Sequence, residues 1–247
     1  MREFGLIGYP LAHSFSKKYF EEKFQRETIA DCSYNLFPLK AIQKLPSLLK
    51  SKPNLMGLNV TIPYKESVIP FLNSVTQEAR EIGAVNCIKV VDNQLHGYNT
   101  DVTGFEISLN HFLNHTPEKI FVLGTGGSSK AVCFVLRKLK MDFLKVSRAE
   151  AAGQILYHQI ESHLGGSNLY INTTPLGMFP QLISAPEIPY DQLTPKDFLF
   201  DLVYNPTETE FLKRGKLRGA ETKNGLEMLE LQAEKSWEIW NNKSQSW

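Results

Sequence analysis

Short apolar runs alternate with amphipathic stretches along most of this chain, and this alternation limits the possible folds more than any other feature. The apolar runs at residues 4–7, 33–39 and 55–60 have the length and pattern of strands. Between them, residues 16–28 and 41–50 carry apolar side chains at helical spacing. Strand–helix–strand alternation predicts a mostly parallel sheet with helices on its faces.

Residues 84–98 depart from this pattern. Two apolar segments flank Asp92 and Asn93, a pair that favours a tight turn, so we expect an antiparallel hairpin and hence a mixed sheet. A helix is expected to begin near Asp101, because an acidic side chain suits the positive end of the helix dipole.

A second alternating unit opens at residues 120–123, where a strand is followed by a glycine-rich turn and a helix to about residue 139. Further strands are expected near residues 143–146, 169–172 and 198–202, and a last helix at residues 225–242. The chain is therefore predicted to be α/β with two domains that divide near residue 104.

The composition is that of an ordinary globular protein. With 42% hydrophobic and 21% charged residues and a formal net charge of +1, disordered tails, membrane proteins and nucleic-acid binders are all disfavoured. Three cysteines, an odd number without a CxxC pair, argue against a disulfide framework and a zinc site. Polar residues interrupt the N-terminal segment too early for a signal peptide, which predicts a cytoplasmic protein.

The glycine-rich turn, residues 124–128, is a candidate phosphate-binding loop. Gly124 would allow the sharp bend and Gly126 would let the backbone approach a pyrophosphate, which then faces the free N–H groups of the helix. Glycines between a strand and a helix also occur in simple tight connections, and the loop alone does not separate these two interpretations.

The residue after the next strand gives information about the cofactor. A NADP-binding protein offers an arginine to the 2′-phosphate at this place, whereas a NAD-binding protein offers an acidic side chain to the ribose. Arg148 follows the strand and Glu150 lies two positions later. This order favours NADP(H), although a surface arginine after a strand is common.

Polar side chains gather where strands of the first domain are expected to end, the places where open α/β sheets bind ligands. The segments are residues 13–16, 59–65, 84–86 and 97–101. Each has a structural alternative, such as helix capping for Ser14 and Ser16 or a solvated charge for Lys65. Together, their hydroxyls and amides suit a substrate with several hydroxyl groups, and Lys65 with Asp101 would suit proton transfer.

This set of segments resembles the shikimate dehydrogenase family from residue 5 to about residue 240. Residues 59–65 read Asn-Val-Thr-Ile-Pro-Tyr-Lys, and residues 97–104 read Gly-Tyr-Asn-Thr-Asp-Val-Thr-Gly, both of which match signatures of that family. Five further segments match in order: residues 8–17, 83–87, 172–178, 201–206 and 225–233.

The resemblance implies a reversible reduction of 3-dehydroshikimate to shikimate with NADP(H), on the route to chorismate and the aromatic amino acids. Lys65 and Asp101 would form the catalytic pair, and no metal would be needed. The implied substrate-binding residues are Ser14, Ser16, Asn59, Thr61, Asn86, Tyr204 and Gln232. The implied cofactor-binding residues are Gly124, Thr125, Gly126, Gly127, Ser128, Arg148, Thr173, Leu202 and Gly225.

The resemblance also implies a discontinuous first domain. Residues 1–104 and 224–247 would form the substrate-binding catalytic domain, and residues 105–223 would form a Rossmann-type NADP-binding domain. The expected partners are small molecules rather than nucleic acid or membrane, and the chain would be a monomer or a homodimer. Four residues depart from the family pattern: Tyr9 and Lys17 replace Asn and Pro, Cys87 replaces Thr, and Glu227 replaces Gly.

Three alternatives compete with this interpretation. A quinate/shikimate dehydrogenase that uses NAD is the nearest, and Ser14, Ser16 and Arg148 favour the shikimate enzyme over it. A binding protein without activity could share the fold, but Lys65 and Asp101 are both retained. A methylene-tetrahydrofolate-type dehydrogenase has a related architecture but does not account for the serine segment.

Overall fold

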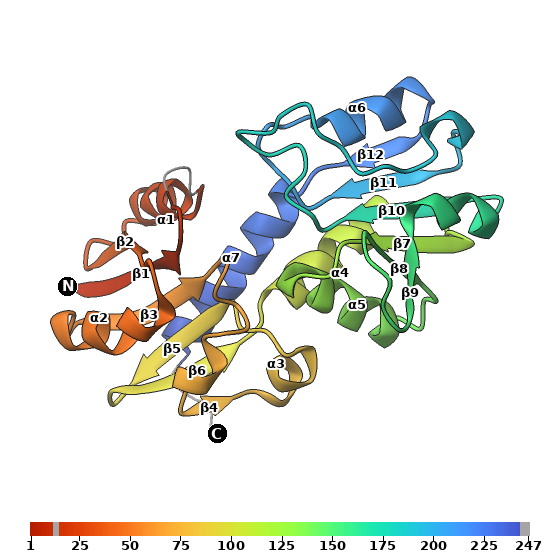
Figure 1. The fold of residues 1–247 in the computed structure, drawn as a ribbon. Coiled ribbons are helices and arrows are strands. Elements are labelled where there is room, and N and C mark those ends of the chain that lie inside the picture. Colours follow the sequence, from red (N-terminus) through yellow and green to blue (C-terminus); the bar gives the residue numbers. More distant parts are fainter. Residues whose placement is uncertain (12–14, 243–247) are drawn as a thin grey trace. The chain divides into compact units, whose positions relative to one another are not determined.

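The computed structural model describes residues 1–11 and 15–242, which divide into two compact units, each built on one six-stranded sheet (Figure 1). Unit 1 comprises residues 1–100 and the chain from residue 232, and unit 2 comprises residues 101–231. The chain thus returns to the first unit after completing the second. The predicted α/β class with two sheets is confirmed.

The sheet of unit 1 is mixed, as the hairpin predicted. Its strands are β1 (Arg2–Gly8), β2 (Cys32–Pro38), β3 (Leu55–Val60), β4 (Ser74–Val75), β5 (Cys87–Val91) and β6 (Gln94–Tyr98). They lie in the order β2-β1-β3-β5-β6-β4, with antiparallel pairing on both sides of β5 and parallel pairing elsewhere. At the hairpin turn Asp92 and Asn93 have φ of 49° and 61°, the positive values that a type I′ turn requires.

The helices of unit 1 are only partly those predicted. They are α1 (Phe15–Arg26), η1 (Ile42–Lys44), α2 (Leu45–Ser51), η2 (Ile69–Phe71), α3 (Gln77–Ile82) and the later part of α7 (Leu226–Asn241). The helix expected over residues 41–50 begins as a 3-10 turn. Helix α3 was not predicted, although Thr76 caps it by accepting from Ala79 N and Gly83, at φ 72°, ends it.

Apolar side chains cover both faces of this sheet. Along β1, Phe4 belongs to a cluster with residues of α1 and α7, whereas Ile7 belongs to the cluster on α2. Trp240 of α7 donates from Nε1 to the carbonyl of Ile88 at 2.9 Å. Gly57 permits this approach, because a Cβ there would lie 2.3 Å from Trp240 Nε1. Helix α7 is therefore both hydrogen-bonded to the sheet and packed closely against it.

Unit 2 has an all-parallel sheet. Its strands are β7 (Lys119–Leu123), β8 (Leu144–Ser147), β9 (Gln154–Leu156), β10 (Asn168–Asn172), β11 (Phe198–Asp201) and β12 (Glu221–Lys223). They lie in the order β12-β11-β10-β7-β8-β9, which is the strand order of the doubly wound dinucleotide-binding fold. The predicted Rossmann-type sheet is confirmed, and its order reverses between β10 and β7.

Helices cover both faces of the sheet in unit 2. The elements are α4 (Asp101–Phe112), α5 (Gly127–Lys138), η3 (Tyr157–His163), η4 (Tyr190–Gln192) and α6 (Glu210–Leu217). Helices α4 and α5 lie on one face and α6 on the other (Figure 1). On β11, Phe200 contacts Phe112 of α4, whereas Leu199 packs under Gly215 of α6. Burial on both faces explains why such strands are continuous apolar runs.

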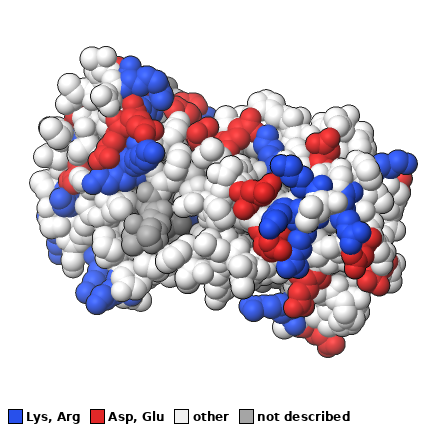
Figure 2. Space-filling view, turned by 90° about the horizontal axis from the view of Figure 1, so that it is seen from above, with Lys and Arg blue, Asp and Glu red and all other residues white. Residues whose placement is uncertain are grey.

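Charges of both signs are mixed on the face drawn in Figure 2, as expected from the small net charge. Among the residues that the structure describes, no helix is both long and apolar enough to cross a membrane.

Candidate active site

Polar residues from three of the predicted segments, Asn59, Asn86 and Thr100, lie near the carboxyl end of β3. Asn59 of β3 pairs with Cys87 of β5, which pairs in turn with Tyr98 of β6. Asn86, just before β5, is tied by its backbone to both neighbours: Val60 N donates to Asn86 O at 2.8 Å and Asn86 N to Tyr98 O at 3.1 Å. Antiparallel pairing across three strands therefore gathers Asn59, Asn86 and Tyr98, which are far apart in the sequence.

Asn86 and Gln232 are joined through Thr100. Thr100 N donates to Asn86 Oδ1 at 2.6 Å, which fixes the orientation of the amide. Asn86 Nδ2 donates to Thr100 Oγ1 at 3.0 Å and to Gln232 Oε1 at 3.3 Å. The structure thus brings together two predicted substrate residues that lie 146 positions apart in the sequence.

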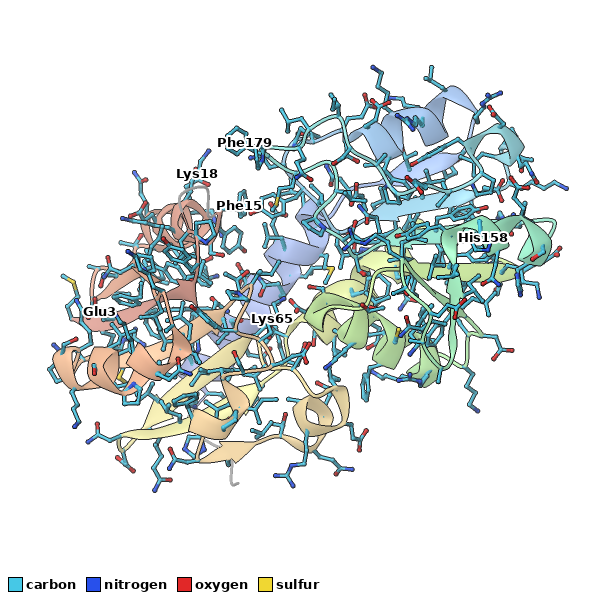
Figure 3. All side chains as sticks on the ribbon, viewed as in Figure 1. Glu3, Phe15, Lys18, Lys65, His158 and Phe179 are labelled. Atoms are coloured by element: carbon cyan, nitrogen blue, oxygen red, sulfur yellow. The ribbon has the colours of Figure 1, made fainter. Side chains whose placement is uncertain are left out.

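Lys65 lies in the loop after β3 (Figure 3), and this loop is well fixed. Thr61 N donates to Ile7 O at 2.9 Å, and Val85 N donates to Lys65 O at 2.7 Å. The Lys65 side chain is half-buried. Asp101 is buried at the first position of α4 and directly follows Thr100. The pairing of Lys65 with Asp101 stays a prediction.

The serine segment is described only in part. Ser16 lies in the first turn of α1, near the Tyr34 hydroxyl. Burial raises the pKa of Tyr34 well above its usual 10.0, against the effect of Ser16. Tyr34 in turn donates to Asn59 Oδ1 at 2.8 Å. Ser14 lies outside the described residues.

In unit 2 the predicted cofactor residues follow the carboxyl ends of five neighbouring parallel strands, in the order β12-β11-β10-β7-β8. The residues in that order are Gly225, Leu202, Thr173, Gly124 and Arg148. Carboxyl ends of parallel strands lie at one edge of a sheet, and open α/β sheets bind ligands at this edge. The set spans the point between β10 and β7 where the strand order reverses.

Two pairs of these residues are in contact. Gly124 has φ of 109°, and a Cβ there would lie 2.7 Å from Thr173 Oγ1, which donates to Leu123 O at 2.7 Å. A Cβ on Gly225 would lie 2.2 Å from Leu202 O. Both glycines are therefore required for close packing between neighbouring strand ends.

The N-terminus of α5 is open to an anion. Gly126 caps the helix without a side-chain hydrogen bond, and a Cβ on it would meet nothing within 4 Å. Ser129 Oγ donates to Gly124 O at 2.8 Å and fixes the loop. Thr125 and Gly126 are exposed, and Gly127 and Ser128 are half-buried. A helix start whose capping residue has no side chain lets a phosphate group approach the backbone N–H groups.

A buried pair behind this edge was not predicted. Asn172 Nδ2 donates to Asp201 Oδ1 at 2.9 Å, and Asp201 also accepts from Val203 N at 3.0 Å and Thr209 Oγ1 at 2.5 Å. Burial raises the pKa of Asp201 to about 6, against the effect of these donors. The pair ties the loops after β10 and β11 together, and these loops carry Thr173, Leu202 and the half-buried Tyr204.

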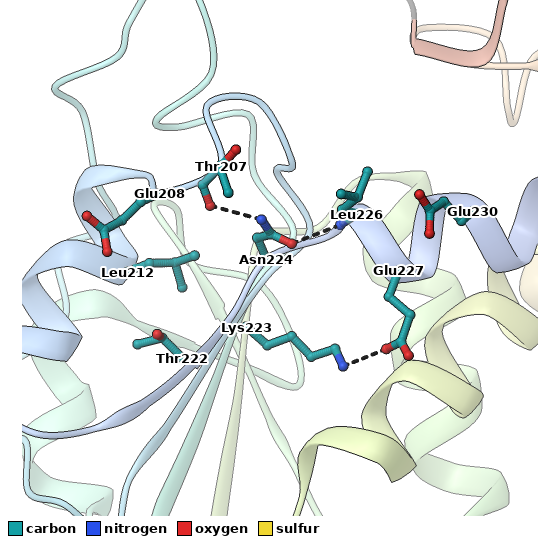
Figure 4. Close-up of a pocket in the computed structure, with 9 residues that line it drawn as sticks. All are labelled: Thr207, Glu208, Leu212, Thr222, Lys223, Asn224, Leu226, Glu227 and Glu230. Carbon is teal, nitrogen blue, oxygen red and sulfur yellow. Dashed lines mark hydrogen bonds and ion pairs between the residues drawn. The ribbon is translucent and has the colours of Figure 1, made fainter. Parts of the chain in front are cut away.

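A pocket of about 490 Å³ lies beside the carboxyl end of β12 (Figure 4). Its lining includes three carboxylates, from Glu208, Glu227 and Glu230. Burial acts to raise the pKa of Glu227, but hydrogen bonds from His111, Lys223 and Ser108 lower it to about 2. None of the predicted site residues lines this acidic pocket, and it is unsuited to a phosphate.

Among the described residues, no group of three or more His, Cys, Asp or Glu side chains could hold a metal ion.

The chain is similar to known proteins along its length. Residues 6–88 match the family described as the shikimate dehydrogenase substrate binding domain. The shikimate dehydrogenase (NADP(+)) of Clostridium beijerinckii is 38% identical, covering 97% of this chain and 92% of that protein.

The chain is also similar to solved structures of shikimate dehydrogenases. Shikimate dehydrogenase 1 from Peptoclostridium difficile is 34% identical with a TM-score of 0.83, covering 100% of this chain and 94% of that chain. The Thermus thermophilus enzyme in complex with NADP(H) and shikimate is 28% identical with a TM-score of 0.81, covering 98% and 94%. With its strand order and its ordered polar segments, the chain belongs to the shikimate dehydrogenase family.

Proposed function

We propose that this chain catalyses the reversible, NADPH-dependent reduction of 3-dehydroshikimate to shikimate, a step towards chorismate and the aromatic amino acids. The observation that carries the proposal is the row of cofactor-type residues along the carboxyl edge of the parallel sheet in unit 2. The relatives with NADP(+) in their names support the cofactor.

The chain's own residues account for the binding of a dinucleotide phosphate. The glycine loop, residues 124–128, would hold the pyrophosphate with backbone N–H groups at the start of α5. Arg148, exposed after β8, would pair with the 2′-phosphate, which NAD lacks. Thr173, Leu202 and Gly225 would line the remainder of the site. The bound nicotinamide supplies the hydride.

Proton transfer would belong to Lys65 and Asp101. Reduction of the C3 carbonyl creates an alkoxide, and an ammonium group beside that oxygen stabilises the charge and donates a proton. Lys65 has the needed donor on a fixed loop, and Asp101 would orient it and favour its charged form.

Polar side chains would hold the hydroxyls and carboxylate of shikimate. The proposed substrate residues are Ser14, Ser16, Asn59, Thr61, Asn86, Tyr204 and Gln232. The joined amides of Asn86 and Gln232 support this assignment, because amides can both donate to and accept from hydroxyl groups.

The domain assignment and cellular location are part of the proposal. Residues 1–104 and 224–247 would bind the substrate and residues 105–223 would bind NADP(H), in a cytoplasmic monomer or homodimer. The three free cysteines suit a reducing compartment.

The test is the change in nicotinamide absorbance when the purified chain is mixed with shikimate and either NADP or NAD. Rapid reduction of NADP with little reduction of NAD is expected. Rapid reduction of NAD, with quinate as a second substrate, would instead support the NAD-dependent alternative, and no reduction with either cofactor would refute an enzymatic role.

A Lys65→Ala variant tests the catalytic assignment. Because the ammonium group would act on the reacting oxygen, turnover should fall by ~10²-fold or more while the affinity for NADPH stays unchanged. Turnover at the rate of the unmodified chain would remove Lys65 from the mechanism.

A further inference from the structure

Six polar side chains of unit 1 form one continuous hydrogen-bond network around Ser236 of α7. The members are Tyr34, Asn59, Asn86, Thr100, Gln232 and Ser236, and none is more than 8% exposed. Buried polar groups of this kind are costly unless every member finds a partner. Ser236 is fully buried and is the member at which three segments of the chain meet.

The hydrogens of Ser236 and its partners can be assigned from the distances. Ser236 Oγ donates to the Gln232 carbonyl, one helical turn earlier, at 2.9 Å. A hydroxyl has one hydrogen and two lone pairs, so Ser236 can then accept from Asn59 Nδ2 at 2.9 Å and from Thr100 Oγ1 at 3.1 Å. Thr100 Oγ1 also lies 3.2 Å from Asn86 Oδ1 and 3.4 Å from Gln232 Oε1.

Thr100 in turn fixes the orientation of the Asn86 side chain. The Thr100 oxygen accepts from Asn86 Nδ2 at 3.0 Å, while Thr100 N donates to Asn86 Oδ1 at 2.6 Å. One orientation of the Asn86 amide satisfies both bonds. On the other side, Asn59 is held between Ser236 and the Tyr34 hydroxyl.

We propose that Ser236 is a positioning residue for substrate recognition. It acts through Thr100 to fix the amide of Asn86 beside that of Gln232, so that the two amides are oriented before shikimate binds. The inference rests on the proposed function, in which Asn86 and Gln232 contact the substrate. A preset orientation spares the substrate the cost of ordering these side chains.

The test is Ser236→Ala, which leaves Thr100 Oγ1 and Asn59 Nδ2 without this partner. We expect the KM for shikimate to rise ~10-fold, the kcat to stay within ~2-fold and the KM for NADP to be unchanged. Ile239→Val is the matched control, because it removes one buried methyl group from the apolar side of the same helix. Both KM values of this control should equal those of the unmodified chain.

Thr100→Val provides a second route that does not depend on the stability of the first variant. It removes the link between Ser236 and Asn86 and should raise the KM for shikimate by a similar factor. Adding Ser236→Ala to it should then change KM by less than ~2-fold, since coupled residues are not additive.

Several outcomes would overturn the inference. The positioning role is excluded if the KM for shikimate is unchanged in Ser236→Ala. It is also excluded if the double variant shows a full ~10-fold further rise in that KM. An equal rise of the KM values for shikimate and NADP in both Ser236→Ala and Ile239→Val would exclude it as well. The unmodified chain is assayed alongside: if it oxidises shikimate, these results leave the proposed function intact, and if it does not, both proposals fail.

Discussion

Replacement of Asp201 by asparagine should change how the stability of the protein depends on pH. Asp201 is fully buried with a pKa raised from 3.8 to about 6 by burial. At 1.36 kcal/mol per pH unit, ionisation of this carboxyl in the folded chain costs about 3 kcal/mol. Asparagine has nearly the same shape and never ionises, so it should avoid this cost.

The direction of this pH dependence follows from the pKa of Asp201, which is 3.8 in the unfolded chain and about 6 in the folded chain. The folded chain binds the proton more tightly than the unfolded chain, so the stability from this group is fully present below pH 3.8 and is lost as the pH rises through about 6. About half of this 3 kcal/mol of stability is lost between pH 5 and pH 8. The amide can keep the existing bonds, since its oxygen can accept from Asn172 and Val203, and its nitrogen can donate to Thr209 Oγ1.

The assay is urea unfolding of both chains at pH 5 and pH 8. The free energy of unfolding of the Asp201→Asn variant, relative to the unmodified chain, should increase by ~1.5 kcal/mol between these pH values, because all other groups cancel in the difference. A difference that is independent of pH would refute the reasoning. Thr209→Val offers an internal check: with a lowering hydrogen bond removed, the pKa of Asp201 rises, and the pH-dependent range should move upward.

Three further predictions concern the cofactor edge and the core. Arg148→Ala should raise the KM for NADPH ~10-fold or more and leave that for NADH nearly unchanged; an unaltered preference would remove Arg148 from the phosphate site. Gly124→Ala should lower the free energy of unfolding by ~1–3 kcal/mol and weaken NADPH binding, because φ is 109° and the new Cβ would meet Thr173; calorimetry and fluorescence titration measure the two effects. Trp240→Phe should cost ~1–3 kcal/mol, because the Ile88 carbonyl loses its donor; urea unfolding unchanged from the unmodified chain would contradict this.

Apolar periodicity was sufficient to predict the central strands of both sheets and the hairpin of unit 1. The strands that it missed, β4, β9 and β12, have two or three residues each, too few for a periodic pattern to be recognised. Helix α6 was missed for a similar reason, since its eight residues form little more than two turns. Its cap, Thr209, is visible in the sequence but is also a member of the buried Asp201 cluster.

The site could be predicted as a set of residues but not as an arrangement. Gly124 and Gly225 were identified from their segments, whereas the contacts that require them, with Thr173 and with Leu202, depend on which strands are neighbours. Ser236 was not identified at all. Its only signal in the sequence is its place one turn after Gln232, and its side-chain partners Asn59 and Thr100 lie 177 and 136 positions away.

The division of the chain between the units has a consequence for how the protein is made. Residues 101–231 are synthesised before the part of α7 that carries Gln232, Ser236 and Trp240. A ribosome adds roughly 5–20 residues per second, and domains generally fold as they emerge. All six strands of unit 2 are therefore synthesised before unit 1 receives the helix that completes its apolar cluster and its polar network. The first unit to be started is the last to be finished, and a stop codon that removes only α7 would disable it while leaving most of unit 2 in place.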